Sequence, residues 1–239
     1  MSYSVPYTIV LLPGLACDGA LMQAQHEALA RSHRVVVSDV HARCDTLPAM
    51  AHTLLSEHTG PLVLVGSSMG GMVAMEAARQ APARVCGLAL LGTTARADTP
   101  ELIALRSKAC AYFAAGRIDE VLDANLLLAF HPLHAANAGL VKAYRAMVGR
   151  AGAAQLIRQN HAVMARADLR YALPALQMPA LVACGEADRL TPPEHSREMA
   201  ALLPMSQLEI VPGAGHLLTM EAPARVNTLL LDWLRQLSA

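Results

Sequence analysis

The feature that most constrains this fold is a regular alternation between short apolar runs and longer segments with helical periodicity. Each apolar run is bounded by turn residues, which is typical of a strand that is buried on both faces. Because a helical segment separates most neighbouring runs, we predict right-handed crossovers and a doubly wound, mainly parallel α/β sheet of about six strands. The predicted strands are residues 7–12, 34–39, 61–66, 85–92, 180–185 and 207–213.

The alternation is interrupted once, after the fourth predicted strand. Between residues 97 and 176 no strand pattern occurs, and Ala, Leu and Met dominate. An insertion at this point would cover the carboxyl ends of the strands, where open α/β folds bind ligands. We therefore predict an α/β core made of residues 1–97 and 176–239, and a helical cap of residues 98–175. Core helices are predicted at 19–32, 47–58, 69–81, 193–203 and 222–237, and cap helices at 99–115, 117–129, 134–149 and 152–167.

Charge and cysteine content exclude several classes of protein. The 19 basic and 19 acidic side chains cancel, so no overall field favours nucleic acid or an anionic membrane. No apolar run approaches the roughly 18–20 residues of a membrane span, and no signal peptide pattern opens the chain. The cysteines are odd in number and scattered, which argues against a disulfide framework or a zinc site. We expect a cytoplasmic protein; the cysteines are Cys17, Cys44, Cys86, Cys110 and Cys184.

The segment GSSMG, residues 66–70, has the pattern G-x-S-x-G centred on Ser68. It follows a predicted strand and opens a predicted helix, which is the context of a nucleophile elbow. Such a sharp turn requires small residues two positions before and after the serine, and the start of the helix favours a developing anion. Ser67 offers a second hydroxyl, but it falls on the strand side of the turn. We predict Ser68 as a nucleophile; taken alone, a glycine-rich turn with incidental serines is equally consistent with the pattern.

A serine nucleophile needs a base and a carboxylate that orients the base. His216 lies in the loop after the last predicted strand, in VPGAGHLL, and Asp188 follows the fifth predicted strand, in CGEADRLTPP. Both residues are predicted at the same edge of the sheet as Ser68. Glu186 is the alternative acid, although its side chain would point differently. Seen singly, Asp188 and His216 could each be ordinary loop residues; their joint placement predicts a catalytic triad.

The backbone must also supply two N–H donors for the oxyanion of a tetrahedral intermediate. The amide of Met69 follows the predicted nucleophile, and the amide of Leu15 lies in LLPGLACDG, after the first predicted strand. Only the backbone of these two residues would act, so their side chains are free to be apolar. A plain Pro-Gly turn explains the Leu15 loop equally well by itself.

Together, PGL, GSSMGG, GEADRLTPP and GAGHLLTMEAP resemble the α/β-hydrolase superfamily, in its compact, capped carboxylesterase-like branch. The resemblance covers residues 5–97 and 176–237, and it includes the chain order Ser68, Asp188, His216. It implies a serine acyl hydrolase with no metal and no organic cofactor. Two departures are a proline, Pro13, where many relatives have histidine, and the lack of extra N-terminal strands.

The second half of the predicted cap is locally basic, since no acidic residue occurs between Asp123 and Asp168. An anionic substrate or an acidic carrier protein could be attracted there, although a solvated basic surface explains the same pattern. The resemblance includes esterases that act on a carrier-protein methyl ester, and enol-lactonases. We predict a small-molecule ester or thioester substrate; the alternatives are lyase chemistry on the same triad and a non-catalytic binding module. The cap cations are Lys142, Arg145, Arg150, Arg158 and Arg166.

Overall fold

The computed structural model of this chain describes residues 7–237. Within them, six parallel strands form one sheet in the order β2-β1-β3-β4-β5-β6. The predicted α/β fold class is confirmed, and every strand pair in the sheet is parallel. Residues 1–6 and 238–239, at the outer ends of the predicted core, lie outside the described residues. The strands are β1 (Thr8–Leu12), β2 (Arg34–Val37), β3 (Leu62–Ser67), β4 (Val85–Leu91), β5 (Ala180–Gly185) and β6 (Ser206–Val211).

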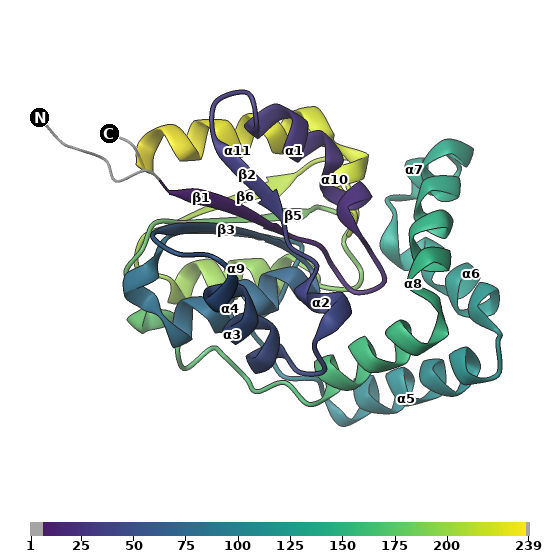
Figure 1. Cartoon of the computed structure of the whole chain (residues 1–239). Coiled ribbons are helices and arrows are strands. Elements are labelled where there is room, and N and C mark those ends of the chain that lie inside the picture. The colour runs from purple at the N-terminus through teal and green to yellow at the C-terminus, as the bar shows by residue number, and fades with distance from the viewer. Residues whose placement is uncertain (1–6, 238–239) are drawn as a thin grey trace, which may run out of the picture.

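Helices cover both faces of the sheet, as the doubly wound pattern requires. In Figure 1, α1 and α11 lie on one face, and α3, α4 and α9 lie on the other. The chain runs outward from β1 to β2 and then returns to β3 on the other side of β1, so the strand order reverses at β1. Ligands in open α/β folds bind at such a reversal, beyond the carboxyl ends of the strands. The core helices are α1 (Gln23–Leu29), α2 (Val40–Arg43), α3 (Leu47–Glu57), α4 (Met69–Gln80), α9 (Pro193–Leu202), α10 (Leu218–Glu221) and α11 (Pro223–Leu237).

The core helices differ from the sequence prediction in three places. The helix predicted at 19–32 is instead a 3₁₀ turn, Gly19–Met22, followed by the shorter α1. Two four-residue helices, α2 and α10, were not predicted, because one turn is too short to produce a periodic apolar pattern. Further 3₁₀ turns occupy Pro82–Arg84 and Leu173–Ala175.

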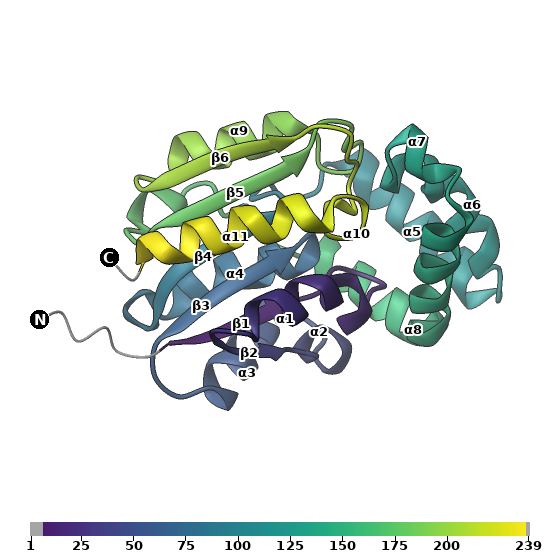
Figure 2. The ribbon, with the colours of Figure 1, turned by 90° about the horizontal axis from the view of Figure 1, so that it is seen from above.

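Four helices lie between β4 and β5, and we call them the inserted helices: α5 (Pro100–Ala114), α6 (Ile118–Ala129), α7 (Pro132–Ala135) and α8 (Ala138–Met164). They lie beyond the end of the sheet toward which the strand arrows point (Figure 2). α8 consists of two helical segments that meet at a kink at Gly152, whose backbone is non-helical, with φ 69° and ψ 167°. The break between the two helices predicted at 134–149 and 152–167 therefore occurs, as a kink at Gly152 and not as a longer loop.

The inserted helices share a buried apolar cluster with the core. Phe113, Phe130 and Tyr144 belong to the same cluster as Ala16 and Cys17, which follow β1. A second cluster fills the opposite face of the sheet, beneath α3 and α4.

Within residues 7–237, no helix has the length and apolarity that crossing a membrane requires.

Candidate active site

Ser68 lies at the turn between β3 and α4. Its backbone has φ 53° and ψ −119°, and it is one of two non-glycine residues with positive φ between residues 7 and 237. A backbone conformation of this kind costs about 1–3 kcal/mol and persists only where the surrounding structure imposes it. The turn leaves the Ser68 side chain partly exposed above the sheet, although the flanking residues Ser67 and Met69 are buried. The placement agrees with the nucleophile-elbow pattern.

The glycines beside Ser68 are required by close backbone packing. A Cβ atom on Gly66 would lie 2.3 Å from the carbonyl oxygen of Gly70. A Cβ atom on Gly70 would lie 2.0 Å from the carbonyl oxygen of Leu12, at the end of β1. Both neighbours are backbone atoms, which cannot move aside as a flexible side chain can. The G-x-S-x-G pattern therefore reflects contact between the turn and β1 as well as the turn itself.

We expect Gly70→Ala to lower the free energy of unfolding by at least about 2 kcal/mol, because the added methyl group overlaps the main chain of β1. Urea unfolding measures the effect. The matched control is Gly149→Ala in α8, where an added Cβ has no neighbour within 4 Å; this variant should be neutral or stabilised by up to about 1 kcal/mol. Equal stability of the two variants would contradict the packing argument.

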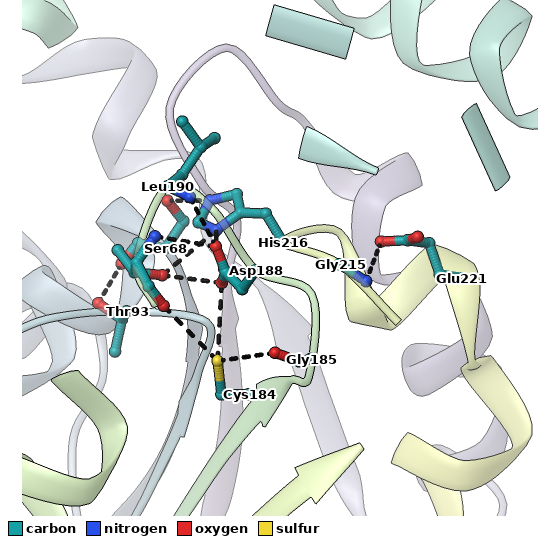
Figure 3. Close-up of polar contacts among 10 residues, drawn as sticks. Ser68, Thr93, Cys184, Gly185, Asp188, Leu190, Gly215, His216 and Glu221 are labelled. Atoms are coloured by element: carbon teal, nitrogen blue, oxygen red, sulfur yellow. Dashed lines mark hydrogen bonds and ion pairs between the residues drawn. The ribbon is translucent and has the colours of Figure 1, made fainter. Parts of the chain in front are cut away.

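His216 and Asp188 extend from separate loops toward Ser68 (Figure 3). His216 lies between β6 and α10, and its Nε2 atom is 2.9 Å from Ser68 Oγ. Its Nδ1 atom is 2.9 Å from Asp188 Oδ2 and 3.1 Å from Oδ1. His216 is 6% exposed and Asp188, which follows β5, is 3% exposed. The structure thus brings together the three side chains that the sequence placed at strand ends.

The hydrogen bonds define the protonation pattern of this group. A carboxylate accepts, so His216 Nδ1 carries the hydrogen that faces Asp188. In the neutral imidazole, Nε2 then has a free lone pair that accepts from the Ser68 hydroxyl. This tautomer is the one in which a histidine can take a proton from serine.

The Asp188 carboxylate is held in the ionised form by its surroundings. Burial by itself would raise its pKa, but the electrostatic interaction with His216 and hydrogen bonds from His216 and Thr191 outweigh burial, and the pKa is lowered. The donors include the Leu190 amide at 2.9 Å, the Thr191 amide at 2.8 Å and the Thr191 hydroxyl at 2.9 Å. A carboxylate with several donors keeps a fixed orientation, so it also fixes the ring of His216.

Two further residues contact the site and were not identified from the sequence. The Thr93 hydroxyl, after β4, donates to the Ser68 carbonyl at 2.6 Å. The buried Cys184 thiol lies 3.8 Å from Asp188 Oδ2. Burial, together with the nearby Asp188 charge, raises the pKa of Cys184 to about 12, so the thiol remains protonated and can donate. Thr93 lies in no segment singled out from the sequence, and Cys184, although it begins CGEADRLTPP, has no feature there that points to the site; their contacts in space identify them.

The two alternative residues weighed from the sequence lie outside this hydrogen-bonded group. Ser67 is 1% exposed, and its hydroxyl has no hydrogen-bond partner within residues 7–237. Glu186 is exposed and accepts from the Gly213 amide at 2.7 Å. The geometry therefore favours Ser68 over Ser67, and Asp188 over Glu186.

The two amides predicted for the oxyanion belong to segments that adjoin Ser68. Met69 is the first residue of α4, so its amide belongs to the free end of the helix. The loop of Leu15 lies against the serine, because a Cβ atom on Gly14 would be 3.1 Å from Ser68 Cβ. In the described part of the chain, neither amide donates to a protein acceptor. Both are thus available to a ligand bound at Ser68.

Glu221 links the His216 loop to the inserted helices. Its side chain is fully buried, and it accepts from the amide of Gly215 at 3.0 Å (Figure 3) and from the amide of His131 at 2.7 Å. It also lies 3.0 Å from His134 Nδ1, in α7. Gly215 directly precedes His216, so this carboxylate fixes the loop on which His216 lies.

No cluster of three or more potential metal-ligating side chains occurs in residues 7–237.

Comparison with known proteins places this arrangement among hydrolases. A family model described as serine aminopeptidase, S33, matches residues 23–223. The chain is 30% identical over 227 residues to a pimeloyl-(acyl-carrier protein) methyl ester esterase of Xanthomonas oryzae pv. oryzae, and the match covers 87% of each chain.

Solved structures give the same result. A thermophilic esterase from Thermogutta terrifontis, with malate bound, has a TM-score of 0.89 and 30% identity, over 98% of this chain and 92% of that chain. The enol-lactonase from Burkholderia xenovorans LB400 has a TM-score of 0.86 over 98% of this chain and 94% of that chain. Its identity of 22% supports a shared fold alone.

Proposed function

Because this chain belongs to the serine aminopeptidase S33 family and has the α/β-hydrolase fold, we propose that it cleaves carboxylic esters or thioesters through an acyl-enzyme. The observation that carries the proposal is the continuous series of hydrogen bonds from Ser68 through His216 to Asp188, with both His216 contacts at 2.9 Å. The ester activity named for two relatives at 30% identity supports the choice of substrate class.

The reaction uses groups of this chain and one water molecule. Ser68 Oγ attacks the carbonyl carbon while His216 Nε2 takes the hydroxyl proton. The oxyanion accepts hydrogen bonds from the Leu15 and Met69 amides. When the intermediate collapses, the bond to the leaving alcohol or thiol breaks, and His216 returns the proton to it. Water then attacks the acyl-serine by the same route, releasing the acid and restoring Ser68.

Asp188 assists without exchanging a proton. Its carboxylate stabilises the imidazolium that forms when His216 takes the proton, and it keeps the ring in the reactive tautomer. Its lowered pKa supports this role, because the group must remain negative when His216 becomes positive. His216 and Asp188 are both buried, so their mutual attraction is screened less than at the surface.

We further propose that residues 98–175 act as a cap that limits substrate size. The inserted helices lie over the strand ends (Figure 2), and their buried aromatic residues belong to the same apolar cluster as residues of the loop after β1. An acyl group bound at Ser68 would lie between the cap and this loop. The proposed substrate therefore carries a small to medium acyl chain; an ester linked to an acidic carrier protein is included because a related esterase bears that name.

The arginines in α8 and directly after it give little support to an anionic ligand, because acidic residues elsewhere in the fold pair with them. Arg145 pairs with Asp119 at 3.5 Å and also with Asp123, both on α6. Arg150 pairs with Asp18 at 2.6 Å, in the loop after β1. The remaining arginine pairs are Arg158 with Asp45 at 3.5 Å and Arg166 with Asp98 at 2.7 Å.

We therefore expect a terminal carboxylate on the acyl chain to change kcat/KM by less than about threefold, since paired charges add little attraction. Matched p-nitrophenyl esters with and without that carboxylate, assayed at low and at physiological salt, measure the effect. If the ester with the carboxylate were preferred by more than tenfold, and if added salt reduced that preference, the basic residues of α8 would instead be a binding site for an anionic substrate.

The proposed function is tested by trapping the nucleophile. A fluorophosphonate should inactivate the enzyme with one adduct per chain, and mass spectrometry of the digested protein should place it on the peptide that contains Ser68. Hydrolysis of a short ester should be lost in proportion to labelling. Full activity after prolonged exposure, or an adduct on another residue, would overturn the acyl-enzyme mechanism.

A further inference from the structure

The loop that follows β1 contains a strained tight turn. The Cys17 amide donates to the Gly14 carbonyl at 3.2 Å, so Leu15 and Ala16 are the two central residues of a β-turn. Ala16 has φ 65°, and Leu15 is not among the positive-φ residues of the described chain. A positive φ at the second central position alone defines a type II turn, which normally has glycine there. Alanine in this conformation costs roughly 1 kcal/mol.

The strain has a simple way to relax. If the peptide between Leu15 and Ala16 turned over, the loop would become a type I turn with Ala16 at negative φ. That rotation would reverse the direction of the Leu15 carbonyl and of the Ala16 amide. The Leu15 amide belongs to the preceding peptide, between Gly14 and Leu15, so this rotation would not reverse it. It lies in the same turn, however, and a rearranged turn would displace it from the oxyanion site to which we assign it.

One side chain from the inserted helices opposes this rotation. Gln159 lies on α8 and is 0% exposed. Its Oε1 atom accepts from the Ala16 amide at 2.9 Å, and its Nε2 atom donates to the His41 carbonyl at 3.0 Å. The His41 ring in turn lies 2.8 Å from the Cys17 carbonyl, which accepts from Nε2. Gln159 is therefore fixed at both ends of its amide, and it pairs the amide that the strained turn directs into the protein.

We propose that Gln159 is a positioning residue that holds the Leu15–Ala16 turn in its strained form, so that the loop carrying the Leu15 amide stays in place at the oxyanion site. The inference rests on the proposed function, because it assigns a role within the same site. It also links the cap to catalysis, since Gln159 belongs to α8 and the turn belongs to the core. Loss of this side chain would leave a buried amide unpaired in a strained turn, and both effects favour rotation of the peptide.

The test compares Gln159→Met with Asn160→Leu. Methionine has a similar size but cannot accept from Ala16. Asn160 is the adjacent buried amide of α8, and its contacts are with Leu156 of the same helix and with Arg106. We expect Gln159→Met to lower kcat by roughly 10- to 100-fold with KM within about threefold, since loss of a whole oxyanion donor costs about 10²–10³. Asn160→Leu should stay within about threefold of wild type.

A second readout separates positioning from general loss of structure. Affinity for an alkyl boronic acid, which forms a tetrahedral adduct with serine, should fall with kcat in Gln159→Met. Adding Ala16→Gly should recover part of both losses, because glycine adopts positive φ without strain. Equal effects of the two single variants, or unchanged boronate affinity, would overturn the inference.

The wild-type protein provides an independent measurement if Gln159→Met does not fold. The Ala16 amide should exchange with solvent slowly in hydrogen-exchange NMR, although it lies in a loop. Exchange at the rate of an exposed amide would overturn the inference. Failure of fluorophosphonate to label Ser68 would instead overturn the proposed function, so the two failures are distinguishable.

Discussion

Replacing Ser68 with alanine should lower kcat for a short p-nitrophenyl ester by about 10⁴- to 10⁶-fold and abolish labelling by fluorophosphonate. The variant lacks the atom that forms the acyl-enzyme, and removal of a triad nucleophile has effects of this size in serine hydrolases. Residual turnover would come from direct attack of water on the bound ester, with the oxyanion amides stabilising the negative oxygen that forms. Kinetics at saturating substrate, with circular dichroism to confirm folding, measure the effect.

The matched control for this variant is the adjacent hydroxyl. Ser67→Ala removes a buried oxygen that has no hydrogen-bond partner within residues 7–237. We expect kcat within about threefold of wild type and no loss of stability, since no hydrogen bond is broken. If Ser68→Ala retained turnover, or if Ser67→Ala were the inactive variant, the assignment of the nucleophile would be wrong.

Asp188→Asn should lower kcat by about 10³- to 10⁴-fold while leaving the position of His216 nearly unchanged. The asparagine amide can donate to His216 Nδ1, which favours the tautomer with hydrogen on Nε2. That nitrogen would then face Ser68 Oγ, 2.9 Å away, without a lone pair to accept the proton. Kinetics at neutral pH measure the loss, and the wrong tautomer should be visible in the ¹⁵N spectrum of the imidazole.

Glu186→Gln is the control for Asp188→Asn, because it neutralises an acid two positions earlier in the same loop. Glu186 is exposed and contacts the Gly213 amide. We expect its kcat within about threefold of wild type. Comparable losses in the two variants would show that net charge, and not the contact with His216, determines the effect of Asp188.

Asp188 also makes stability depend on pH. Its pKa is lower in the folded chain than the value of about 4 expected when unfolded, so the carboxylate stabilises the native state above that value. This contribution is lost as pH falls through the folded pKa. The stability that wild type gains from this carboxylate, measured as its free energy of unfolding minus that of Asp188→Asn, should therefore be constant near neutral pH. It should decrease as the pH falls below about 4.

The sequence determined the strands, the order of the site residues and the turn at Ser68, because these depend on short-range patterns. Most of the strands are short apolar runs bounded by turn residues, so six were predicted, and six occur within residues 7–237, although the edge strands β2 and β6 are only partly buried. The small residues at positions 66 and 70 fit the turn because any Cβ there would overlap the main chain. The order Ser68, Asp188, His216 is a property of the chain itself.

Only the tertiary structure decided which distant groups meet. The acids that pair with Arg150 and Arg158 are more than a hundred residues away in the chain, so the local sequence of α8 appears basic although these arginine charges are compensated. Gln159 reaches Ala16 across 143 residues, and Glu221 reaches His131 across 90. Such contacts leave no periodic signal, because side-chain pairing is set by the packing of helices against the sheet and not by spacing along the chain.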